Sequence, residues 1–137
     1  MTTASSNSQP VDYEKLILSW IRYYDAGIRR GGQVVDDDKD SWAAKMVDDL
    51  LRIDPETAWD VIERIVERVD DPAVLGCIGA GPLEDLLAKH GRDFIDRVIA
   101  DIGRSPKFAE VAESVWQNVI PSDVWVSLQK ALRQRPA

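Results

Sequence analysis

Carboxylates are the commonest side chains able to do chemistry in this sequence, and five of them fall on one face of a predicted helix. Their positions advance in steps of four, three, four and three residues, which forms one continuous stripe on an α-helix. The stripe consists of Glu56, Asp60, Glu63, Glu67 and Asp70. Like charges at these spacings destabilise a helix by about 0.3 kcal/mol per pair, and Arg64 and Arg68 offset only part of that. We therefore expect a binding surface for a basic protein partner; a merely solubilising face is the alternative.

The net charge supports this interpretation and argues against nucleic-acid binding. The chain carries −7 overall, so it is poorly suited to neutralising phosphates. Residues 36–71 hold 13 acidic and 5 basic residues, a net charge of −8, while the remainder sums to +1. The negative field is therefore concentrated in the middle of the chain.

Candidates for catalysis or metal binding are few. His90 is the only histidine and Cys77 the only cysteine, whereas zinc sites and catalytic triads draw on several such residues. We expect His90 in the last turn of a helix, bonded to terminal carbonyl groups, and Cys77 in the core. The acidic run 36–40 lacks the glycine and glutamate of a calcium-binding EF-hand loop. We predict no catalytic residue, no metal and no cofactor.

The segment Gly79–Pro82 allows a second functional hypothesis. It is rich in glycine, as phosphate-binding turns are, but no lysine follows it and Glu84 and Asp85 would repel an anion. We expect a tight corner between two helices. The alternative function is a small-ligand-binding or enzymatic domain with a pocket near Gly79–Pro82 and His90.

The tryptophans are numerous, at five in 137 residues. Most fit apolar helix faces and are expected in the core. Trp59 lies at the margin of its helix, next to the acidic stripe, so we assign it to the protein-binding surface.

Apolar residues recur at helical spacing along the chain, and the predicted fold class is all-α. Three helices should begin where a capping residue precedes proline, at Asp54-Pro55, Asp71-Pro72 and Ser105-Pro106. We also expect a break at Gly79–Pro82, a helix end at Gly91, and a helix from Pro106 through Trp116 and Val119 that stops at Pro121.

A weak repeat raises the possibility of a solenoid. Residues 62–69 resemble residues 95–102, an offset of 33, which is typical of stacked helical hairpins. The architecture is therefore either a compact irregular bundle or a short HEAT-like α-solenoid of about two helical-hairpin units.

Residues 1–10 are small and polar and are predicted to form a flexible tail, followed by a single helical domain over residues 11–137. The start has neither the basic nor the apolar region of a secretory signal, and no apolar run approaches the ~20 residues of a membrane span. With one cysteine, the expected location is the cytoplasm.

Several segments resemble a family of small uncharacterised bacterial all-helical proteins. They are AGPLEDLL (80–87), FIDR (94–97), PKF (106–108), VW (115–116) and PSDVW (121–125), of which the first is the most specific. The resemblance covers roughly residues 55–132 and implies a bacterial source and an all-α fold, with no established activity.

The sequence thus favours a non-catalytic protein-interaction module whose acidic face meets a basic partner. An immunity or inhibitor protein that guards against a cationic toxin enzyme would be one form of it.

Overall fold

A computed structural model of the chain describes residues 12–32 and 39–135. The predicted tail, residues 1–10, and most of the acidic run 36–40 lie outside them.

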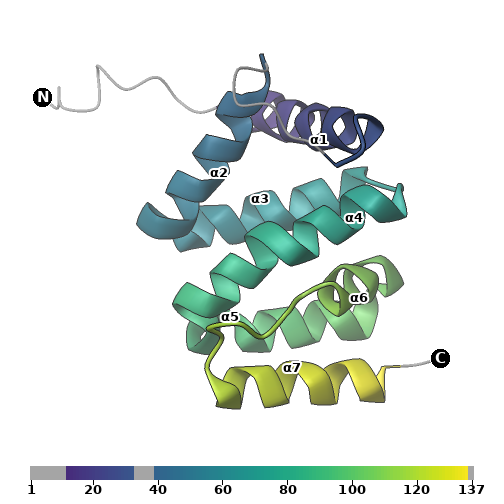
Figure 1. Cartoon of the computed structure of the whole chain (residues 1–137). Coiled ribbons are helices and arrows are strands. Elements are labelled where there is room, and N and C mark those ends of the chain that lie inside the picture. The colour runs from purple at the N-terminus through teal and green to yellow at the C-terminus, as the bar shows by residue number, and fades with distance from the viewer. Residues whose placement is uncertain (1–11, 33–38, 136–137) are drawn as a thin grey trace, which may run out of the picture.

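Every regular element of the described residues is helical, which confirms the all-α fold class. In chain order the elements are α1 (Tyr13–Arg29), α2 (Ser41–Ile53), α3 (Pro55–Arg68), α4 (Pro72–Ile78), the π-helical turn η2 (Gly79–Leu83), α5 (Glu84–Arg104), α6 (Pro106–Glu113) and α7 (Ser122–Gln134). They succeed one another from α1 and α2 at one end of the molecule to α7 at the other (Figure 1). The HEAT-like repeat stays a prediction.

The three predicted proline starts are confirmed, and in each the preceding side chain caps the helix. The backbone N–H of Thr57 donates to Asp54 Oδ1 at 3.2 Å at the start of α3. Asp71 and Ser105 accept equivalent bonds at the starts of α4 and α6, at 2.9 and 3.1 Å. Each cap satisfies an amide that has no partner inside the helix, while proline occupies a position where no amide is needed.

The predicted break at Gly79–Pro82 is wrong, because η2 keeps the chain helical between α4 and α5. The expected close contact is nevertheless present at Gly79. A Cβ atom on Gly79 would lie 2.1 Å from the carbonyl oxygen of Val111 in α6. Glycine is therefore required here by a close approach of two helix backbones.

The predicted helix end at Gly91 is confirmed to within one residue. α5 consists of two helical segments that meet at a kink at His90, where φ is −136° and ψ is 27°. Gly91 is buried where a Cβ atom would lie 2.9 Å from a methyl group of Val124 in α7, so it serves packing. His90 Nε2 donates to the carbonyl oxygen of Leu51 at 3.0 Å, in the last turn of α2. His90 was expected to bond carbonyl groups at the end of its own helix, and it instead bonds one at the end of α2.

α6 ends at Glu113, earlier than predicted. Beyond it, the carboxylate of Glu84 accepts a bond from the backbone N–H of Trp116 at 2.9 Å and another from Asn118 Nδ2 at 2.7 Å. These contacts hold the segment in a non-helical course, and Asn118 adopts a φ of 40°. Trp116 and Val119 are consequently exposed at 71% and 79%.

Candidate functional site

Basic residues lie beside four of the five stripe carboxylates, and three of these basic residues come from α5 and α6. The last stripe residue, Asp70, lies beyond the end of α3. Arg97 of α5 binds Glu56 through two bonds of 2.7 and 2.9 Å. Lys107 of α6 lies 3.1 Å from Asp70, and Arg64 lies 3.2 Å from Asp60 within α3. Arg68, expected to offset the stripe, instead binds Glu14 of α1. The stripe is therefore more fully compensated than Arg64 and Arg68 alone would make it.

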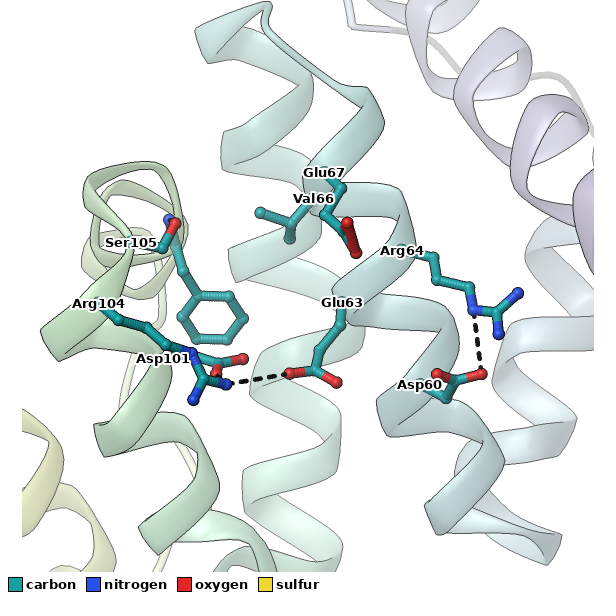
Figure 2. A pocket seen from close by; sticks show the side chains of 9 residues that line it. Asp60, Glu63, Arg64, Val66, Glu67, Asp101, Arg104 and Ser105 are labelled. Atoms are coloured by element: carbon teal, nitrogen blue, oxygen red, sulfur yellow. Dashed lines mark hydrogen bonds and ion pairs between the residues drawn. The ribbon is translucent and has the colours of Figure 1, made fainter.

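The middle of the stripe lines a cavity of about 280 Å³ between α3 and the corner where α5 meets α6. We call this cavity the acidic groove. Its lining comprises Asp60, Glu63, Arg64, Val66, Glu67, Asp101, Arg104, Ser105 and Phe108 (Figure 2). Glu56 and Asp70 are not among these residues, so the structure places only Asp60, Glu63 and Glu67 of the stripe in one site.

The groove contains a pair of carboxyl groups that sequence reasoning missed. Glu63 of α3 faces Asp101 of α5 across the groove (Figure 2), and Asp101 is only 5% exposed. Arg104 forms an ion pair with Asp101, and its guanidinium lies 3.9 Å from Glu63 (Figure 2). The guanidinium of Arg104 is therefore the basic partner of both Glu63 and Asp101.

This arrangement changes the acidity of Glu63. Burial, the hydrogen bond to Asp101 and the charge of Asp101 raise the pKa of Glu63 from 4.5 to about 7, although Arg104 acts in the opposite direction. At pH 7 the carboxyl group of Glu63 is thus about half protonated, because its ionisation beside Asp101 is unfavourable. The pair can donate a hydrogen bond when protonated and can accept a cation when ionised.

Ser105 also lines the groove, but its hydroxyl oxygen caps α6 by accepting from the backbone N–H of Phe108. Within the described residues, no group of three or more His, Cys, Asp or Glu side chains is placed to hold one metal ion.

The assignment of Trp59 to the binding surface is wrong. Its side chain is 6% exposed, and its ring lies 6.2 Å from that of Phe94 and 5.7 Å from that of Phe108, between centroids. On α3 alone, Trp59 lies at the margin of the apolar face. In the folded chain, α5 and α6 pack over this margin and bury the side chain. Trp59 therefore packs in the core against Phe108, which lines the acidic groove, and it does not lie on the surface.

The alternative pocket near Gly79–Pro82 and His90 does not form as one site. The cavity beside His90, of about 260 Å³, is lined by residues 88–93 and Pro121 and does not reach Gly79–Pro82. Gly79 is covered by α6. Cys77, expected in the core, is half-buried, and burial raises its pKa, which leaves the thiol less reactive.

Comparisons with known proteins place the chain in a family without assigning it an activity. Residues 31–136 match the "Family of unknown function (DUF6869)", and the chain belongs to this family. Searches among curated proteins and among solved structures found no match. Over residues 12–32 and 39–135, no helix has both the length and the apolar character needed to cross a membrane.

Proposed function

We propose that this protein is a non-catalytic protein-interaction module whose acidic groove receives a basic side chain of a partner. The observation that supports this most is the pair Glu63 and Asp101, which shares the single guanidinium of Arg104. A lysine or arginine side chain from a partner would take the place of the retained proton. It would form charge-assisted hydrogen bonds, which are about twice as strong as neutral ones.

The size of the groove suits one side chain. About 280 Å³ lies at the lower end of ligand-binding cavities, so a long basic side chain fits and a whole helix does not. Asp60 and Glu67 at its rim are both exposed and extend the negative surface toward solvent.

The charge of the chain supports the approach of such a partner. With −7 overall, and −8 within residues 36–71, the protein attracts a cation from beyond contact distance. This attraction acts mainly on the association rate, and salt weakens it over a Debye length of about 8–10 Å.

A bacterial cytoplasmic immunity or inhibitor protein, directed against a cationic toxin enzyme, would use a groove of this kind. Small size and net acidity suit that role. We also propose that the helices stack as a short HEAT-like solenoid, an architecture that presents extended concave binding surfaces.

Reversing the two exposed acids at the rim should weaken binding of a basic ligand. We expect Asp60→Lys combined with Glu67→Lys to raise the Kd for a fluorescein-labelled peptide Gly-Arg-Gly-Arg-Gly-Arg-Gly at least about tenfold. Fluorescence polarisation at two salt concentrations measures both the affinity and its salt dependence. The fold should survive, since both side chains are exposed, and circular dichroism checks this.

A matched control separates the groove from net charge. Asp93→Lys with Asp96→Lys makes the same change in charge at two exposed positions of α5 that do not line the groove. This control should shift the Kd by less than about threefold. Equal losses in the two double variants would show that the peptide responds to net charge only and would overturn the proposal.

A further inference from the structure

On the premise of the proposed function, we infer that the partner segment carries a large apolar side chain close to its basic one, seated in a second cavity beside the acidic groove. The two side chains would be separated by about three residues in an extended segment.

The second cavity lies on the other side of the corner between α5 and α6 and measures about 660 Å³. Its floor is apolar and includes Ile102, Pro106 and Ala109. Glu113 and Arg135 at its edge lie 2.9 Å apart and neutralise each other. Arg104 and Glu110 also line the cavity, so two acidic and two basic residues surround the apolar floor. An apolar floor with a charge-balanced rim suits an aliphatic or aromatic side chain.

The two cavities share Arg104 as a lining residue. The first turn of α6 separates them, because Ser105 and Phe108 line the acidic groove whereas Pro106 and Ala109 line the second cavity. An α-helix with its side chains is about 10–12 Å across. An extended segment of polyproline II geometry advances about 3.1 Å per residue and returns every third side chain to the same face. A segment that crosses this turn thus places side chains about three residues apart in the two cavities.

Charge complementarity identifies the kind of occupant. The acidic groove favours a basic segment, and a second copy of this chain, with its net charge of −7, is repelled. A basic segment with a neighbouring apolar residue satisfies both cavities at once, and the apolar residue adds affinity that charge alone does not provide.

Selection of random nonapeptides displayed on phage against the whole protein tests the inference. We expect the recovered peptides to share an arginine or lysine and, about three positions away, a leucine, isoleucine, methionine or aromatic residue. Peptides enriched only in basic residues would overturn this inference and leave the proposed function standing. Enrichment that is unchanged on the variant with Asp60→Lys and Glu67→Lys would overturn both. Self-association of the protein through this face, seen by sedimentation, would overturn the inference as well.

A variant that fills the second cavity gives an independent test. Gly103 lines this cavity, and a Cβ atom there would meet nothing within 4 Å, so Gly103→Phe adds bulk without a clash at the backbone. This variant should raise the Kd of a peptide that carries both arginine and leucine about tenfold. It should leave the Kd unchanged for a peptide that has glycine in place of the leucine. Gly81→Phe is the matched control, since Gly81 also has open space at its Cβ and does not line either cavity. Equal affinity of the first peptide for the wild type and for Gly103→Phe would contradict the inference.

Discussion

Replacing Gly79 with alanine is expected to lower the free energy of unfolding by about 3 kcal/mol or more, because overpacking at a rigid contact is costly. The new Cβ atom would lie 2.1 Å from the carbonyl oxygen of Val111 and 2.8 Å from Ser114 Cβ. Since the first of these atoms belongs to the backbone of α6, a change of side-chain rotamer cannot relieve the overlap. η2 and α6 would have to separate, which urea-induced unfolding measures directly.

Gly103→Ala provides the control for this prediction. Its Cβ atom would meet nothing within 4 Å, and alanine favours a helix over glycine, so we expect a gain of up to about 1 kcal/mol. If Gly79→Ala proved as stable as Gly103→Ala, the close approach of η2 to α6 would be wrong.

Glu63 should make the protein less stable as the pH rises through neutrality. Its pKa is raised to about 7 in the folded state, whereas the pKa of a glutamate in an unfolded chain is 4.5. The folded state thus binds the proton more tightly, and the stability associated with that proton is complete below pH 4.5 and lost between pH 4.5 and about 7. Because a third of the side chain is exposed, at 32%, solvent screening reduces the effect to about 1–2 kcal/mol.

Glu63→Gln isolates this contribution from those of other acids. The amide can donate to Asp101 as the protonated carboxyl group does, but it cannot ionise. Thermal and urea unfolding at pH 5 and pH 8 should show similar stability of the two proteins at pH 5. At pH 8 the variant should be more stable, by about 1–2 kcal/mol. Equal stability of the wild type and the variant at pH 8 would contradict this prediction, because it would show that ionisation of Glu63 does not destabilise the fold.

Local signals predicted much of the fold. Asp54-Pro55 and Ser105-Pro106 specify helix starts through the chain's own caps, so those starts are correct. Errors occurred where distant residues decide the backbone. Glu84 holds Trp116 outside α6 from 32 residues away, and Gly79 lies in a continuous helical stretch against α6 where a break was predicted.

In the candidate site, too, local features could be predicted and contacts between distant residues could not. The stripe was visible because four of its five residues share α3, but its neutralising partners Arg97 and Lys107 come from α5 and α6. Asp101 could have been noticed, since it continues the buried face of Phe94 and Val98 at helical spacing. Its contact with Glu63 could not, because nothing in the sequence specifies which helices pack together.

The most direct test of the acidic groove is isothermal titration calorimetry of the whole protein with the arginine peptide at pH 7, in two buffers of different ionisation enthalpy. If a cation replaces the proton retained by Glu63 and Asp101, binding should release about half a proton, since the pKa of Glu63 is about 7. Glu63→Gln should release none and bind more weakly. Binding by the wild type without proton release, or with the same release in Glu63→Gln, would contradict the assignment of the groove as the binding site.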